Sequence, residues 1–344
     1  MSATPIRLID LGPAPFWQTQ AVYHAIAGLM RDGTPDTIIL TSPRTPYLCL
    51  GYHDIYDAVL DLEAVARRGL PVMRRRVGGG TTYLDSDQIF YQCVFHHRRV
   101  PAQLSAIYER LLAAPLTTLQ RLGLSARLCD TLELEVQGRR IAGIGGGRIG
   151  DAAVVVGNLL FDFDYTAMAE VWRTPWPSFR ELAAGALRDH VTTLREQRGS
   201  VAADDVYALL REAFAAALGR PLQVGELTRA ETRYARKLGT RMSSDEYLNL
   251  HHERAQDHLA RPLKIAAGVF IHAVSVDLAG CAMQASLRVH DGQIAQARLE
   301  SQPPRNWSWA EAALQHQPFA DWERRALALQ LSEGTCTPRS SAYP

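Results

Sequence analysis

Three consecutive glycines at positions 78–80 interrupt two apolar stretches, and this arrangement constrains the fold more than any other part of the chain. Residues 70–73 predict a strand that enters the glycine loop, and residues 88–95 predict a strand that leaves it. Because glycine has no Cβ, the loop's backbone N–H groups can approach a ligand closely. The arginines at 74–76 could pair with phosphate or carboxylate. The pattern is typical of a phosphate cradle, or of a tight surface turn beside solvated arginines.

The composition excludes several classes of protein. A chain of 344 residues is long enough for two domains, and 47% hydrophobic with 21% charged residues indicates a globular rather than a disordered chain. A net charge of +1 offers no surface for a polyanion, so we expect no nucleic-acid partner. No apolar run approaches the roughly 18 residues that suggest a membrane span. The N-terminus lacks the basic and apolar regions of a signal peptide, so we expect a cytoplasmic protein.

Helical and strand-like patterns mix irregularly along the chain. Apolar residues at helical spacing predict helices over residues 16–31, 102–122 and 204–218. Short apolar runs predict strands near residues 37–41 and 152–163. Without a strict βαβ repeat, this order predicts an α+β fold with a largely mixed sheet.

A polar, histidine-rich passage over residues 248–261 is typical of a linker. Strand-like patterns resume beyond it, and Asp291-Gly292 predicts a hairpin turn between two of these strands. We therefore expect a catalytic domain over residues 1–250 and a small C-terminal accessory domain over residues 262–335.

Three short blocks resemble one known family. Arg74-Arg75, two further residues, the three glycines and Asp85 five residues beyond resemble the signature of the lipoate–protein ligase and octanoyltransferase superfamily, which is related to biotin ligases. The sequences Gly-Arg-Arg-Ile-Ala-Gly-Ile-Gly at 138–145 and Val-Gly-Asn-Leu-Leu at 156–160 are similar to two further blocks of this family. The resemblance spans most of the first 165 residues. It implies a mixed-sheet biotin/lipoate ligase-like catalytic domain with a small C-terminal α/β accessory domain.

The resemblance also implies a reaction. In the family, lipoate or octanoate becomes attached to a lysine of a lipoyl domain or an H-protein-like acyl carrier. The ligases first convert the carboxylate and ATP into an acyl-adenylate, whose phosphate leaves readily, and Mg²⁺ and positioned donors stabilise the developing charge. ATP, Mg²⁺ and such a carrier are therefore the expected cofactors and partner.

The same resemblance assigns roles to individual residues. Arg140 matches a family lysine that contacts the acyl carbonyl and the phosphate, and Asp130 matches an acidic residue that supports Mg²⁺. The positions that match substrate- and nucleotide-binding residues are Arg75, Val77, Gly78, Gly79, Gly80, Gly143 and Gly157.

The chain departs from the family pattern at its most important position. Arg140 keeps the charge of the family lysine but presents a broad planar fork, and no lysine precedes Lys237. Leu84 and the pair Val155-Val156 stand where the family has histidines, which leaves an apolar wall that could still hold an acyl chain. These exchanges favour a ligase of weakened activity.

Three functions stay open at this point. The first is an ATP-dependent ligase with Arg140 in the lysine role. The second is an octanoyltransferase that forms a thioester on Cys129, which requires a cationic neighbour to lower the pKa of the thiol. The third is a non-catalytic relative that binds lipoate or the acyl carrier. Cys129 lies closer to the 138–145 block than the nucleophile of comparable octanoyltransferases does, so the pattern favours the ligase and a structural Cys129.

Overall fold

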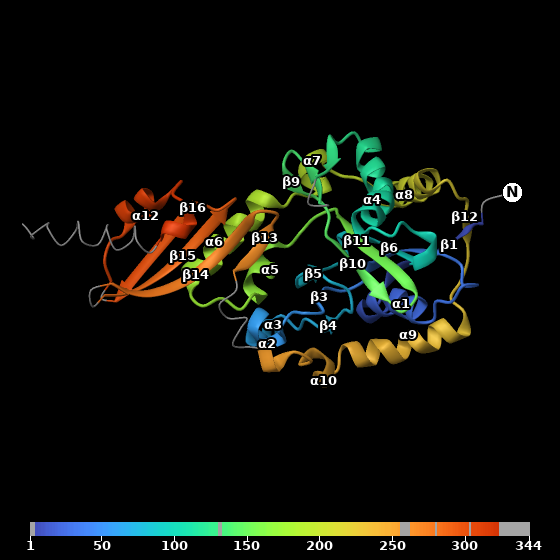
Figure 1. The fold of residues 1–344 in the computed structure, drawn as a ribbon, viewed down its shortest axis with the longest axis horizontal. Helices are drawn as coiled ribbons and strands as arrows, with labels where there is room; N and C mark the ends of the chain where they lie inside the picture. The colour runs from blue at the N-terminus through green and yellow to red at the C-terminus, as the bar shows by residue number, and fades with distance from the viewer. Residues whose placement is uncertain (1–3, 130–132, 255–261, 279–280, 303, 323–344) are drawn as a thin grey trace, which may run out of the picture. The chain divides into compact units, whose positions relative to one another are not determined.

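The protein has the mixed α+β fold that its sequence predicts (Figure 1). The computed structural model describes residues 4–129, 133–254, 262–278, 281–302 and 304–322. None of the helices within these ranges is long and apolar enough to cross a membrane.

The chain divides into two compact units. Unit 1 contains Met1–Arg173 and Asp189–His258, and unit 2 contains Thr174–Arg188 and Leu259–Pro344. The sequence pattern assigns residues 174–188 to the catalytic domain, whereas in the structure they belong to unit 2. The domain boundary expected between residues 250 and 262 stays a prediction.

Unit 1 is built on a six-stranded sheet. In spatial order its strands are β10 (Ile144–Ile149), β11 (Ala152–Leu160), β6 (Gln88–His96), β2 (Thr37–Pro43), β1 (Ile6–Ala14) and β12 (Leu222–Val224). β1 pairs in parallel with both β2 and β12, whereas β2, β6, β11 and β10 form antiparallel pairs. The sheet is therefore mixed, as the irregular order of helix and strand patterns predicts.

Helices cover both faces of this sheet (Figure 1). The helices are α1 (Phe16–Gly28) and α9 (Arg229–Met242) on one face and α4 (Leu104–Arg121) and α8 (Ala203–Leu218) on the other. Neighbouring β2 residues show why both faces are buried, because side chains alternate along a strand. Ile38 packs in the core shared with α4 and α8, and Ile39 packs in the core shared with α1 and α9.

Two small sheets of unit 1 carry the sequence blocks. The first has the order β4 (Val72–Arg74), β3 (Tyr47–Leu50) and β5 (Thr82–Leu84), and the second runs β7 (Ala126–Leu128), β8 (Leu134–Val136) and β9 (Arg139–Arg140). The glycine loop therefore connects β4 to β5, and β6 follows only after a further turn. Strands of three or four residues are too short for a periodic pattern, which explains why the sequence does not predict β3 and β5.

Short helices complete unit 1. They are α2 (Tyr56–Val59), α3 (Leu62–Arg67), η1 (His97–Arg99), α5 (Tyr165–Val171), α7 (Leu194–Arg198), α10 (Asp245–Leu248) and η2 (His252–Arg254). α10 ends at the first residue of the passage that the sequence predicts as a linker, η2 lies within that passage, and its residues 255–261 lie outside the described ranges.

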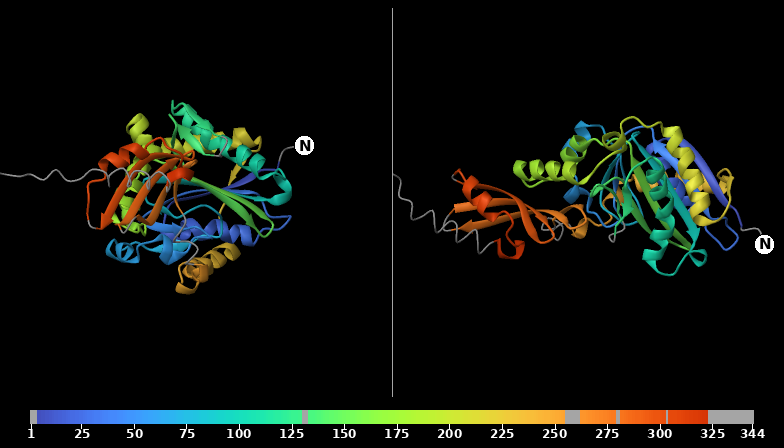
Figure 2. Two further views of the ribbon diagram at one scale, coloured as in Figure 1. Left: turned by 60° about the vertical axis from the view of Figure 1, so that its left-hand side comes forward. Right: turned by 90° about the horizontal axis from the view of Figure 1, so that it is seen from above.

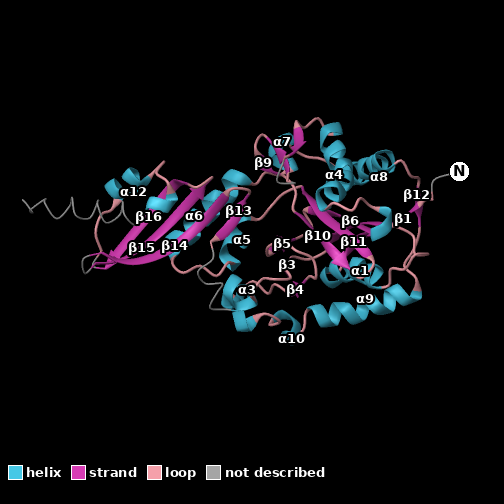
Figure 3. Ribbon diagram, in the orientation of Figure 1, coloured by secondary structure: helices cyan, strands magenta, loops and turns pink. Residues whose placement is uncertain are grey.

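Unit 2 is an antiparallel four-stranded sheet with helices on both faces (Figures 2 and 3). Its elements are α6 (Pro177–His190, within unit 2 as far as Arg188), β13 (Leu263–Ala266), β14 (Val269–Leu278), β15 (Cys281–His290), β16 (Gln293–Gln302), α12 (Ser308–Leu314) and η3 (Phe319–Asp321). The predicted hairpin at Asp291-Gly292 is confirmed, with a positive φ at both residues (48° and 78°), as a tight two-residue turn requires.

Alternation along β15 separates the two faces of this sheet. Ala285 and Leu287 belong to the apolar cluster that contains Leu314 of α12. Ser286 points to the opposite face and is fully buried, where the Trp176 indole N–H donates to its hydroxyl at 2.6 Å. The segment that enters α6 thus packs on β15, which explains why residues 174–188 belong to unit 2.

Candidate functional site

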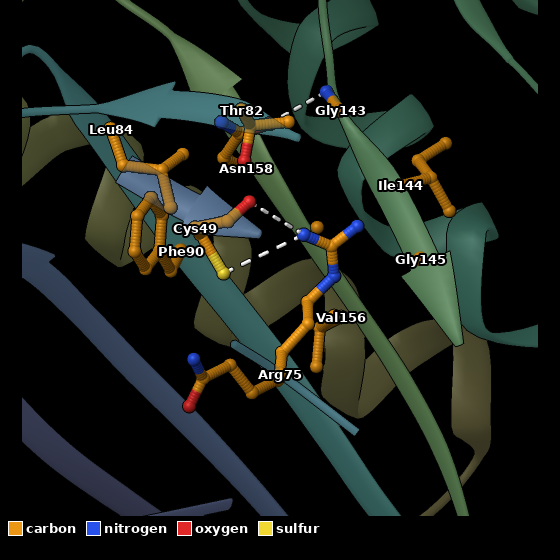
Figure 4. A pocket seen from close by; sticks show the side chains of 12 residues that line it. Cys49, Arg75, Thr82, Leu84, Phe90, Gly143, Ile144, Gly145, Val156 and Asn158 are labelled. Carbon is orange, nitrogen blue, oxygen red and sulfur yellow. Dashed lines mark hydrogen bonds between the residues drawn. The ribbon is translucent and has the colours of Figure 1, made fainter. Parts of the chain in front are cut away.

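The glycine loop is folded around the side chain of Arg75. Its Nη2 donates to the carbonyl of Gly80 at 2.7 Å and to that of Gly78 at 3.2 Å, and its Nε lies 3.4 Å from the same Gly78 oxygen. Its Nη1 donates to the carbonyl of Cys49 at 3.0 Å and approaches the Cys49 Sγ at 3.5 Å (Figure 4). A guanidinium has five N–H groups, and these contacts occupy all of them. Arg75 therefore braces the loop, although the resemblance assigns it to a phosphate.

Gly79 cannot be replaced without strain. Its φ is +101°, and a Cβ there would lie 2.7 Å from Arg75 Nη2. A Cβ on Gly51 would lie 2.0 Å from the Gly79 carbonyl oxygen, so the β3 end also approaches the loop closely. The Gly78 amide donates to Gly146 on β10 at 3.2 Å and is not available to a ligand.

Two amides of the loop remain open to a ligand. Gly79 and Gly80 are exposed, and their N–H groups have no protein acceptor within the described ranges. Val77, by contrast, is buried in the core beneath the loop and does not line the pocket described below. The anion-binding capacity of this loop therefore rests on two backbone amides.

Arg74 holds the base of the loop from below. Its side chain is fully buried and has no exposed surface. Its guanidinium donates to five main-chain carbonyls, those of Gly51, Tyr52, Asp54, Tyr247 and Leu248. The first arginine of the pair thus joins the β3–α2 loop and α10 to β4, and it is a structural residue.

His24 of α1 supports the loop from the other side. Its Nε2 accepts the Arg76 amide at 2.9 Å, and its Nδ1 lies 2.7 Å from the carbonyl of Gln20. These partners require a neutral ring with its hydrogen on Nδ1. Complete burial lowers the pKa of His24 from 6.5 to about 3, so the ring stays neutral at physiological pH.

We expect His24 to make the fold sensitive to acid. Above pH 6.5 the ring is neutral in the folded and unfolded states, so it makes no pH-dependent contribution to the free energy of unfolding. Between pH 6.5 and about 3 only the unfolded state takes up the proton, and the free energy of unfolding falls by about 1.4 kcal/mol for each pH unit. Chemical denaturation from pH 7 to pH 4.5 measures this slope. His24→Gln should lose that part of the slope, and equal slopes for both proteins would contradict the assignment.

A pocket lies beside the braced loop (Figure 4). Its lining residues are Cys49, Arg75, Thr82, Leu84, Phe90, Gln92, Gly143, Ile144, Gly145, Val156, Gly157 and Asn158. Leu84 and Val156, which stand at family histidine positions, belong to its apolar wall together with Phe90 and Ile144. The pocket suits an apolar chain better than a charged group.

One chain of hydrogen bonds links the three sequence blocks at this pocket. Asp85 accepts from Gln88 Nε2 at 3.3 Å, and Gln88 Oε1 accepts from Asn158 Nδ2 at 2.5 Å. Asn158 Oδ1 then accepts the Gly143 amide at 2.6 Å. Burial raises the pKa of Asp85 to about 6. Asp85 and Asn158 therefore hold the pocket wall in place.

The structure brings only some of the expected site residues together. Arg75, Gly143 and Gly157 line the pocket. The sequence analysis did not single out Cys49, Thr82, Phe90, Gln92 or Asn158 as site residues. Phe90 and Gln92 share one face of β6, but the pairing that brings this face to the pocket is not visible in the chain order.

Arg140 belongs to β9 and Cys129 directly follows β7, and neither residue lines this pocket. Both contact Glu133, which sequence reasoning missed. The Cys129 Sγ donates to the Glu133 carbonyl at 3.2 Å, and Arg140 Nη1 lies 3.7 Å from the Glu133 carboxylate. A half-buried thiol and a cation thus share one neighbouring residue.

The described side chains do not form the Mg²⁺ site that the resemblance implies. Asp130 lies outside the described residues. Within the described ranges, no group of three or more histidine, cysteine or acidic side chains could hold a metal ion.

Comparison with known proteins agrees with the sequence blocks. A family model for the lipoyl protein ligase A/B catalytic domain matches residues 16–215. The octanoyltransferase LipM of Kyrpidia tusciae is 26% identical over 266 residues, which cover 70% of this chain and 97% of that relative.

Solved structures share the fold. A bi-partite lipoate protein ligase of Thermoplasma acidophilum, studied with its E2 lipoyl domain, has a TM-score of 0.66 at 22% identity and covers 72% of this chain and 98% of its own. A lipoate-protein ligase A bound with ATP has a TM-score of 0.62 at 21% identity and covers 72% and 100%. Since the family model spans more than half of the sequence, the chain belongs to the lipoyl protein ligase A/B catalytic domain family.

Proposed function

We propose that this protein transfers a medium-chain acyl group, octanoyl or lipoyl, to a lysine of a lipoyl-domain or H-protein-like carrier through a thioester on Cys129. The observation that carries the proposal is that Cys129 and Arg140 both contact Glu133, the first at its carbonyl and the second at its carboxylate. The octanoyltransferase relative, similar over nearly its whole length, supports it further.

The other described thiols fit the nucleophile role poorly. Cys49 and Cys93 are buried, and burial raises the pKa of both thiols. Cys129 is only half-buried, so a substrate can reach its thiol more readily than the two buried thiols. Among these three residues, Cys129 is the best candidate for the nucleophile.

The transfer balances without an external oxidant or a nucleotide. The Cys129 thiolate attacks the carbonyl of an acyl thioester, and the donor's thiol leaves with a proton. The carrier lysine then attacks the new thioester, which forms an amide and returns the Cys129 thiol. The Leu84, Phe90 and Val156 wall would hold the chain during both steps.

An ATP-dependent ligase is the second candidate. The exposed amides of Gly79 and Gly80 favour it because they can donate to a phosphate, and a solved structure of similar fold is bound with ATP. The contacts of Arg75 disfavour this candidate. Its guanidinium donates to carbonyls of Cys49, Gly78 and Gly80, so it is not available to a phosphate. Mg²⁺ would need Asp130, and Arg140 would replace the family lysine.

The carrier partner is proposed from the chemistry and from one neighbour. The similar ligase of Thermoplasma acidophilum was studied with its E2 lipoyl domain. A lysine of such a domain is an amine that can attack a thioester on the enzyme. An H-protein-like carrier would present the same chemistry.

Two reactions distinguish the candidates. The protein is incubated with a lipoyl domain and either an octanoyl thioester of an acyl carrier protein without ATP, or octanoate or lipoate with ATP and Mg²⁺. We expect octanoylation only in the first mixture, and a hydroxylamine-sensitive adduct on Cys129 when the lipoyl domain is omitted, both read by intact mass. Product only in the second mixture would establish the ligase. Carrier binding without product in either mixture would establish a non-catalytic relative.

A further inference from the structure

The solvent-facing side of α9 carries a row of positive charges. The exposed cations follow one another at intervals of four, three, one and four residues, which places them on one face of the helix, opposite its buried residues (Figure 1). None of them forms an ion pair with a residue that the structure describes. The α9 basic stripe, as we name this row, consists of Arg229, Arg233, Arg236, Lys237 and Arg241.

The composition of the chain does not explain the stripe. The net charge is only +1, and several exposed arginines elsewhere in unit 1 pair with carboxylates, for example Arg121 with Glu212 at 2.7 Å. The one acidic residue of α9, Glu231, is buried and pairs with Arg7. Like charges four residues apart destabilise a helix. The stripe therefore lowers the stability of α9, and an acidic partner would restore it.

The stripe ends beside the glycine loop. The guanidinium carbon of Arg241 lies 5.4 Å from the centroid of the Tyr247 ring. Arg74, at the base of the loop, donates to the Tyr247 carbonyl at 2.9 Å. Burial raises the pKa of Tyr247, and the nearby charges of Arg76 and Arg241 oppose this rise. Arg76 is exposed and leads directly into the loop with its two open amides, so the positive surface continues from α9 to the loop.

We propose that the α9 basic stripe binds the acidic surface of the protein that donates the acyl thioester. The inference rests on the proposed acyl transfer and adds the surface on which an acidic acyl carrier protein docks. Such a donor brings negative charge to the stripe and, on the phosphate-linked arm that holds its thioester, to the open loop amides. The lipoyl-domain acceptor must instead present a lysine, whose positive charge Arg76 and Arg241 repel. Opposite charges on the two proteins speed their encounter.

The test compares two donors of the same acyl group. One is octanoyl-acyl carrier protein, and the other is octanoyl-pantetheine, a small thioester without the acidic protein. The triple variant Arg233→Gln/Arg236→Gln/Lys237→Gln removes three charges from α9, and glutamine keeps a high helix propensity. We expect its kcat/KM for the carrier-bound donor to fall by about tenfold or more at low salt. Its kcat/KM for octanoyl-pantetheine should stay unchanged, and added salt should reduce the difference from the wild-type protein.

A second triple variant controls for the change in net charge. Arg67→Gln/Arg110→Gln/Arg121→Gln removes three exposed charges from α3 and α4, and it should leave kcat/KM unchanged for both donors. An equal loss in the two triple variants would overturn the inference, because net charge rather than the stripe would then govern the encounter.

A binding measurement separates this inference from the proposed function. The affinity for octanoyl-acyl carrier protein is measured in Cys129→Ala with and without the three α9 substitutions, so the result requires no transfer. Weaker binding by the substituted protein supports the inference even if no acyl group is transferred, and equal affinities overturn it even if transfer proceeds. A loss of affinity only for the lipoyl domain, for phosphatidylglycerol vesicles or for single-stranded DNA also overturns it. Should the triple variant fail to fold, Arg236→Gln alone should show the same effect at smaller size.

Discussion

Cys129→Ala is expected to lose acyl transfer by at least about 10³-fold while it keeps the fold. Removal of the nucleophile from an enzyme that works through a covalent intermediate lowers kcat by factors of this size or larger. The thiol donates to the main-chain carbonyl of Glu133, just before β8, so its loss should disturb packing little. The measurement is the rate of octanoylation of a lipoyl domain from an octanoyl thioester.

Cys93→Ala is the matched control. Cys93 lies on β6 and is fully buried in the core shared with α4 and α8. The exchange should therefore lower the melting temperature and leave the rate of transfer unchanged. The two variants thus separate chemistry from packing. Undiminished transfer by Cys129→Ala would show that the thioester route is wrong.

Gly79→Val is expected to reduce transfer by about 10²-fold or more. Valine at a φ of +101° costs on the order of 1–3 kcal/mol of strain, and its Cβ would collide with Arg75 Nη2. The guanidinium would have to leave the Gly78 and Gly80 carbonyls, which opens the loop and the adjoining pocket wall. Transfer rates and thermal unfolding of the same preparation give both effects.

Gly33→Ala provides the comparison for this variant. A Cβ on Gly33 meets no atom within 4 Å, and its backbone is not left-handed, so alanine should be neutral for both rate and melting temperature. A Gly79→Val variant that transfers the acyl group as fast as the wild-type protein would contradict the role that these contacts assign to the loop.

The sequence predicts those parts of the protein whose requirements are local. The glycines at 78–80 and the turn at Asp291-Gly292 are visible because particular backbone conformations demand glycine. The helices over 16–28 and 203–218 follow from apolar spacing, and the family resemblance follows from short blocks. Each of these features depends on a few neighbouring residues.

The contacts that decide the site depend on distant main-chain atoms. Arg75 resembles a phosphate ligand in the sequence, but its partners are carbonyls of Cys49, Gly78 and Gly80. Every residue has the same main-chain carbonyl, so the pattern of side chains does not predict which carbonyls will accept these hydrogen bonds. Glu133 was missed for a similar reason, because its contacts depend on the pairing of three very short strands.

The position of residues 174–188 in unit 2 affects how the protein could be divided. These residues precede the second half of unit 1, so a protease cut between 248 and 264 would leave the helix attached to the larger piece. Residues 259–344 expressed alone would lack Trp176 and Ser178, the partners that bury Ser286. Another polypeptide that supplies this helix would restore the two partners of Ser286. The two pieces should therefore reassemble by fragment complementation, and the small module is not a unit that can be shuffled between proteins as one continuous stretch of gene.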